Sequence, residues 1–140
     1  MEGLIQYLLG NEKIALTLRD RYVFKIVPML NPDGVIIGNY RCSLSGHDLN
    51  RQYISPSPKL FPECQAIKQM IKKTLECRKI DIYCDFHGHS RQKDIFIYGC
   101  NNNCSQSSIQ GDKRLREQVF PLMYDRLCPH FSFNGCSFVV

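Results

Sequence analysis

Two short apolar runs, separated by an amphipathic helical pattern, constrain the fold of this chain more than any other feature. Residues 22–28 and 79–86 are rich in β-branched and aromatic residues, which favour buried strands. Between them, residues 61–78 place apolar side chains on one face and lysines on another, which predicts a helix. This order is typical of α/β proteins, so we expect a mixed β-sheet covered by helices on both faces.

The remaining elements follow from weaker patterns of the same kind. Residues 1–10 have helical spacing of apolar residues and end at Gly10, and residues 11–19 continue in a helix-compatible way. Further expectations are a third strand at 95–98, a polar loop at 101–111, a helix at 112–127 broken or restarted at Pro121, and another strand beginning at Ser137.

A long loop is expected between the first strand and the helix at 61–78. The sequence Asn31-Pro32-Asp33-Gly34 is a strong turn signal, because proline presets φ and glycine tolerates positive φ. Glycines and prolines recur from there to Pro62, so no regular structure is expected in this stretch. Loops of this length in a small domain are usually functional.

Composition narrows the class of protein. The chain has 140 residues, which suits one domain, and its net charge of +5 fits an acidic partner without requiring one. It has no run of about 20 apolar residues that could cross a membrane, and no signal peptide at its N-terminus. We therefore expect its eight cysteines to be reduced thiols of a cytosolic protein. The pair Cys100 and Cys104 alone is a weak signal for zinc.

Polar residues suited to holding a carboxylate gather in the long loop. A guanidinium binds a carboxylate through two parallel hydrogen bonds, so Asn50 and Arg51 are well suited to hold the carboxylate of a substrate. A second arginine, Arg41, could stabilise an oxyanion. The alternative is that these groups form ion pairs with Asp33 and Asp48 and only pin the loop. For this combination of residues we favour a functional role.

Two histidines follow the second apolar run, in the sequence Asp85-Phe86-His87-Gly88-His89. An imidazole at a strand end is a common metal ligand, and Asp85 could orient one ring. A lone histidine is more often a satisfied polar residue, so His87 in isolation would not indicate a metal site.

Taken together, these motifs resemble the zinc metallocarboxypeptidase family and, more narrowly, its cytosolic carboxypeptidase subfamily, which removes glutamates from protein tails such as those of tubulin. The resemblance covers nearly the whole chain. The motifs that carry it are residues 31–35, 38–41, 48–51, 85–91 and 98–100, with residues 128–133 also similar to the subfamily.

The resemblance implies a role for each matching residue. Arg41 would be the catalytic residue that polarises the scissile carbonyl, and Asn50 and Arg51 would hold the C-terminal carboxylate of the peptide. His87 would be the last of three ligands of a catalytic Zn²⁺. His89 is a signature of the subfamily for which the resemblance implies no catalytic role.

The chain also departs from the family pattern. The family takes two zinc ligands from a His-x-x-Glu motif, but none of the four histidines here has glutamate three residues later. We therefore expect residues 1–140 to be a single partial catalytic domain that begins after this motif and ends before the general-base glutamate. Alone, such a chain should be inactive, because a catalytic zinc needs three protein ligands.

Several readings stay open at this point. The first is a fragment of a cytoplasmic, cytoskeleton-associated carboxypeptidase whose partners are acidic C-terminal tails, with no nucleic acid and no membrane among them. The second is a non-catalytic chain that binds acidic tails. The third is an aspartoacylase-type hydrolase of acyl-amino acids, which also has an Asp-Leu-Asn-Arg motif, although residues 31–34 and 87–91 argue against it.

Overall fold

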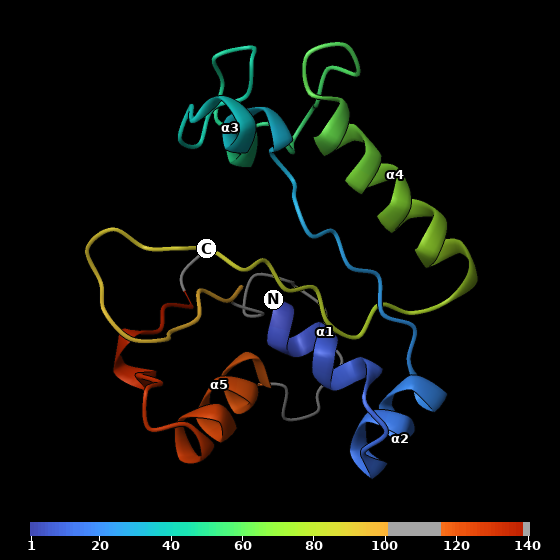
Figure 1. The fold of residues 1–140 in the computed structure, drawn as a ribbon, viewed down its shortest axis with the longest axis vertical. Helices are drawn as coiled ribbons and strands as arrows, with labels where there is room; N and C mark the ends of the chain where they lie inside the picture. Colours follow the sequence, from blue (N-terminus) through green and yellow to red (C-terminus); the bar gives the residue numbers. More distant parts are fainter. Residues whose placement is uncertain (101–115, 139–140) are drawn as a thin grey trace, which may run out of the picture. The chain divides into compact units, whose positions relative to one another are not determined.

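The structure is a computed structural model that describes residues 1–100 and 116–138 (Figure 1). The chain divides into two units, Met1–Phe86 and His87–Val140, and each is considered by itself. The polar loop predicted at 101–111 and the start of the helix predicted at 112–127 lie outside the described residues. Within the described ranges, no helix combines the length and apolar character needed to cross a membrane.

The first unit begins with two short helices, α1 (Glu2–Leu9) and α2 (Lys13–Arg21), which confirm the helical patterns seen in residues 1–19. They contact each other and bury Leu8 of α1 and Ala15 of α2. The guanidinium of Arg19 in α2 donates to the carbonyl of Leu8, so it satisfies a carbonyl that the end of α1 leaves open.

The predicted long loop contains two helical segments that the sequence analysis missed. Helix α3 (Pro32–Ile37) replaces the expected turn, and a 3₁₀ helix, η1 (Leu49–Arg51), lies further along. The same residues that signalled a turn start α3, because the Asn31 side chain caps the helix by accepting the N–H of Gly34 at 3.0 Å. Proline at the first helical position favours the same outcome.

Helix α4 (Pro62–Cys77) confirms the prediction of a helix at 61–78, with Phe61 at its N-cap. Its first turn carries the buried thiol of Cys64, which packs with Leu49 and Phe61 in a small hydrophobic core. Because Leu49 belongs to η1, this core fixes η1 against the start of α4. The thiol of Cys64 also donates to the carbonyl of Leu49 at 3.3 Å.

The second unit contains α5 (Arg116–Leu127) and a 3₁₀ helix, η3 (Phe133–Gly135). The expected break at Pro121 does not occur in this range, since α5 runs through the proline. Pro121 has no backbone N–H, so α5 lacks one helical hydrogen bond at this position. Its side chain is fully buried.

The mixed β-sheet predicted from the sequence is not confirmed. Among the described residues there are no named strands, and only three isolated bridges occur, of which two join residues 95 and 98 in parallel to Phe131 and Ser137. The expected strands at 22–28 and 79–86 form no bridge. Apolar composition indicates which residues suit a pleated surface, but a strand exists only through pairing with a neighbour.

Candidate carboxylate clamp and metal ligand

The guanidinium of Arg41 contacts both an aromatic ring and a carboxylate. Its guanidinium carbon lies 5.2 Å from the centre of the Tyr40 ring, and its Nη1 lies 3.3 Å from Oδ2 of Asp48. Tyr40 first, and Asp48 second, raise the pKa of Arg41. Arg41 is therefore a permanent cation in a defined position, although more than half of its side chain is exposed.

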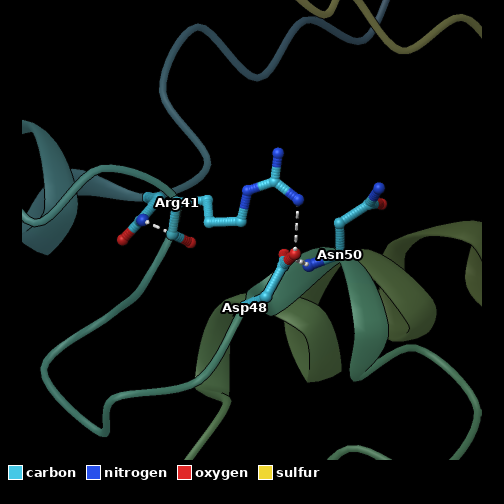
Figure 2. A network of polar contacts seen from close by, with 4 residues as sticks. Arg41, Asp48 and Asn50 are labelled. Carbon is cyan, nitrogen blue, oxygen red and sulfur yellow. Dashed lines mark hydrogen bonds and ion pairs between the residues drawn. The ribbon is translucent and has the colours of Figure 1, made fainter. Parts of the chain in front are cut away.

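One carboxylate connects Arg41 with the segment that contains Asn50. Oδ2 of Asp48 accepts from Arg41, and Oδ1 accepts the backbone N–H of Asn50 at 2.9 Å, so Asp48 caps η1 (Figure 2). Asp48 also forms an antiparallel bridge with Cys42, directly after Arg41. Arg41 and η1 are thus brought together by the fold of the loop itself.

The side chain of Asn31 anchors the backbone of Arg41. Its side-chain Nδ2 donates to the carbonyl of Arg41 at 3.2 Å, while its Oδ1 caps α3. The sequence analysis treated Asn31 only as part of a turn and missed this role. An asparagine directly before a proline is a known helix-capping signal, and it could have identified the start of α3.

Arg51 differs from Arg41 in its contacts. It is the last residue of η1, its side chain is exposed, and no carboxylate lies within ion-pair distance of it among the described residues. Arg41 therefore forms one of the ion pairs that the loop-pinning alternative expects, with Asp48, whereas Arg51 forms none with a described carboxylate. Asp33 contributes a weak contact with the backbone of Leu44 at 3.5 Å and pairs with neither arginine.

Tyr53 packs close to η1, and the sequence analysis also missed it. It packs against the core formed by Leu49, Phe61 and Cys64. Its hydroxyl is buried and has no hydrogen-bond partner among the described residues. Burial, followed by the nearby Tyr83, Cys64 and Asp85, raises the pKa of Tyr53 to about 12.

The second unit carries the candidate zinc ligand and the second histidine. His87 is its first residue and is exposed. The His89 side chain is engaged locally, since its Nδ1 accepts the backbone N–H of Gln92 at 2.9 Å. Across residues 1–100 and 116–138, no three His, Cys, Asp or Glu side chains are grouped so that they could hold a metal ion.

The described cysteines are free thiols: Cys42, Cys64, Cys77, Cys84, Cys100, Cys128 and Cys136. Among these described cysteines, Cys64 alone is buried. Cys104 lies outside the described residues, so the structure does not bear on its pairing with Cys100.

A hollow of about 270 Å³ lies in the first unit, apart from the predicted site residues. Its lining comes from the segment after α2 and the last turns of α4: Val23, Lys25, Lys73, Thr74, Cys77 and Arg78. None of the residues that the sequence analysis selected contributes to it, so it does not enlarge the candidate site.

Comparison with known proteins identifies a family. The sequence model for "Zinc carboxypeptidase" matches residues 1–119. The chain is 50% identical to cytosolic carboxypeptidase 3 of Mus musculus, over 100% of this chain and 14% of that protein. It is 51% identical to cytosolic carboxypeptidase 2 of Homo sapiens, over 100% of this chain and 15% of that protein. The chain therefore spans only a small part of the length of these relatives.

A solved structure agrees with this result. The metallo-carboxypeptidase from Burkholderia cenocepacia matches the fold with a TM-score of 0.73 and 27% sequence identity. The match covers 99% of this chain and 35% of that protein. The arrangement of the elements is therefore of the carboxypeptidase type.

Proposed function

Because this chain belongs to the zinc carboxypeptidase family, we propose that residues 1–140 form part of one catalytic domain that removes C-terminal residues from proteins. Within that domain, Asn50 and Arg51 form a clamp for the substrate carboxylate, and Arg41 is the neighbouring catalytic residue that polarises the scissile carbonyl. The proposed substrates are acidic protein tails that end in glutamate, such as those of tubulin, in the cytoplasm and near the cytoskeleton. Similarity to proteins named cytosolic carboxypeptidases supports this assignment.

The observation that carries the proposal is the link that Asp48 makes between Arg41 and η1. It fixes one guanidinium beside the segment that presents Asn50 and Arg51. Arg51 is exposed and has no acidic partner among the described residues, so its planar group is available to a carboxylate of the substrate. Arg41 would then lie close to the carbonyl of the last peptide bond, where a cation stabilises developing negative charge.

The residues that the structure describes do not fit a complete site for catalytic zinc. Such a site takes three protein ligands and leaves one position open for water. The family resemblance assigns only His87 in this chain, and the described residues provide no group of three potential ligands. We therefore assign substrate binding to this chain and derive no hydrolytic step from it.

Binding of a glutamate-rich peptide tests the clamp directly. We expect the 140-residue chain to bind a peptide with a free C-terminal carboxylate at low salt, measured by fluorescence anisotropy. Amidation of the peptide should weaken binding by about tenfold, because it removes charge-assisted hydrogen bonds. Arg51→Lys should weaken it similarly, since lysine keeps the charge but loses the planar fork.

Lys59→Ala provides the matched control, because Lys59 is an exposed cation that is not part of the clamp. This variant loses one positive charge and should bind almost as tightly as the parent. Equal binding of the free and the amidated peptide would show that only the overall positive charge attracts the peptide, and the clamp would be rejected.

The metal content of the chain tests the zinc assignment separately. After dialysis against metal-free buffer, we expect negligible zinc and no carboxypeptidase activity, because a single ligand such as His87 cannot retain the ion. About one zinc per chain, lost in His87→Ala, would mean that other side chains complete the site. In that case, the assignment of substrate binding alone would have to be withdrawn.

A further inference from the structure

The proposed function gives no task to His89, a residue of the motif at 85–91 whose side chain makes several defined contacts. Its Nδ1 accepts two backbone N–H groups, from Arg91 at 3.3 Å and from Gln92 at 2.9 Å. Hydrogen bonds from a side chain to the backbone two and three residues later hold a tight turn. The two N–H donors share the single lone pair of Nδ1. In this arrangement Nδ1 therefore carries no proton, and the ring proton lies on Nε2.

The ring of His89 also contacts the segment that follows the turn. Its centre lies 5.3 Å from the Phe96 ring and 6.4 Å from the Tyr98 ring, both in edge-to-face geometry. Residues 96 and 98 are two apart in a segment that pairs with another part of the chain, and such residues share a face. One side chain therefore contacts both the turn and that face.

Gln92 extends this connection to a distant part of the unit. Its side-chain amide donates to the carbonyl of Gly135 in η3 at 2.9 Å. The fit is close, because a Cβ added at Gly135 would lie 2.3 Å from Nε2 of Gln92 and 3.3 Å from Cβ of Phe96. The conformation of the turn at residues 89–92 thus determines whether the side chain of Gln92 reaches η3.

We propose that His89 is a positioning residue: its Nδ1 caps the turn of residues 89–92, and its ring holds that turn against Phe96 and Tyr98. The Nδ1 lone pair used in the turn is then not available to a metal. His87 precedes the turn by two residues, so the same cap would fix the backbone that carries the candidate zinc ligand. Only this last consequence rests on the proposed function.

Three substitutions separate the two parts of this role. His89→Asn keeps an acceptor in the same place, because Oδ1 of asparagine and Nδ1 of histidine are both bonded to Cγ. His89→Gln is the matched control, since its acceptor is one bond further along the side chain. His89→Phe keeps the ring and its contacts with Phe96 and Tyr98 but has no acceptor.

Amide hydrogen exchange, measured by NMR on the 140-residue chain without metal, reports on the turn. We expect exchange at Gln92 to accelerate about threefold to tenfold in His89→Phe and His89→Gln, because one hydrogen bond is lost. In His89→Asn it should stay close to that of the parent. The amides of Ser132 and Gly99, which donate to Ile95 and Ser137, should remain protected in all three variants if the unit is folded.

The ¹⁵N chemical shift of the His89 ring gives an independent check in the unsubstituted chain. A lone-pair nitrogen at Nδ1 and a protonated Nε2 are expected at pH 8. A proton on Nδ1, or unchanged exchange at Gln92 in His89→Phe while Ser132 and Gly99 stay protected, would overturn the proposal. Neither measurement involves zinc, peptide binding or catalysis, so a failure here is distinct from a failure of the clamp.

Discussion

Because the hydroxyl of Tyr53 is buried, we expect the first unit to lose stability as the pH becomes strongly alkaline. Burial is the largest cause of its raised pKa, which is about 12 compared with the ordinary value of 10.0. The folded chain therefore holds this proton more tightly than the unfolded chain. The stabilisation is fully present below pH 10 and is lost as the pH rises through 12.

Substitution of Tyr53 by phenylalanine tests this dependence. At pH 7 we expect no loss of stability and a gain of up to about 1 kcal/mol, because the substitution removes a buried hydroxyl that no described residue hydrogen-bonds. Between pH 10 and 12 the free energy of unfolding should fall less steeply than in the parent. Tyr83, whose pKa is also raised by burial, should preserve part of the dependence of the free energy of unfolding on pH.

Urea unfolding at several pH values measures both effects, with Tyr7→Phe in α1 as an exposed control. A slope equal to that of the parent would contradict the assignment.

At the residue scale, sequence analysis could select the clamp residues but not their contacts. Asn50 and Arg51 are predicted because asparagine and arginine suit a carboxylate, and Arg41 because a cation can stabilise an oxyanion; the structure places Arg41 and the backbone of Asn50 around Asp48. The contribution of Tyr53 depends on three-dimensional packing with Cys64, eleven positions later in the sequence, for which no motif exists. The roles assigned to Arg41, to the clamp residues Asn50 and Arg51, and to His87 remain predictions.

At the scale of elements, helix α3 depends on the side chain of Asn31. Asn31→Ala removes the cap and should reduce the free energy of unfolding by about 1 kcal/mol. Asn31→Asp keeps an oxygen for the cap but loses the Nδ2 donor to the carbonyl of Arg41. We therefore expect this variant to retain most of the stability and to bind the glutamate-rich peptide less tightly. Urea unfolding and fluorescence anisotropy measure these effects, and equal stability of the alanine variant and the parent would be incompatible with the cap.

Helices were predictable in this chain because their signals are local. The apolar stripe of α4 and the spacing in α1 lie within single segments, and both helices form close to the expected residues. The expected strands at 22–28 and 79–86 depend on partners elsewhere in the chain, which composition does not reveal. The sequence of residues 31–34 is typical both of a turn and of a helix start, and the sequence analysis predicted a turn. The structure has a helix there, because the Asn31 side chain caps α3.

At the scale of the whole molecule, few side chains form a core among the described residues. Buried hydrophobic residues in the first unit are Leu8, Ala15, Leu49, Phe61 and Cys64. Large apolar residues such as Ile82 and Phe86 are 72% and 61% exposed, which favours association between chains. We expect a broad thermal transition below about 45 °C, followed by aggregation, when melting is monitored by circular dichroism and light scattering. A sharp, reversible transition above about 65 °C in a monomer would contradict this expectation.

Helix α4 carries one buried cysteine and one exposed cysteine. Cys64, in its first turn, is completely buried and its pKa is raised by burial, whereas Cys77, at its last residue, is exposed. An alkylating reagent can therefore modify Cys77 in the folded chain, but it reaches Cys64 only when the packing around Leu49 and Phe61 opens. The labelling rate of Cys64 relative to that of Cys77 therefore measures how often this small core opens, and Cys77 in the same helix serves as the internal reference.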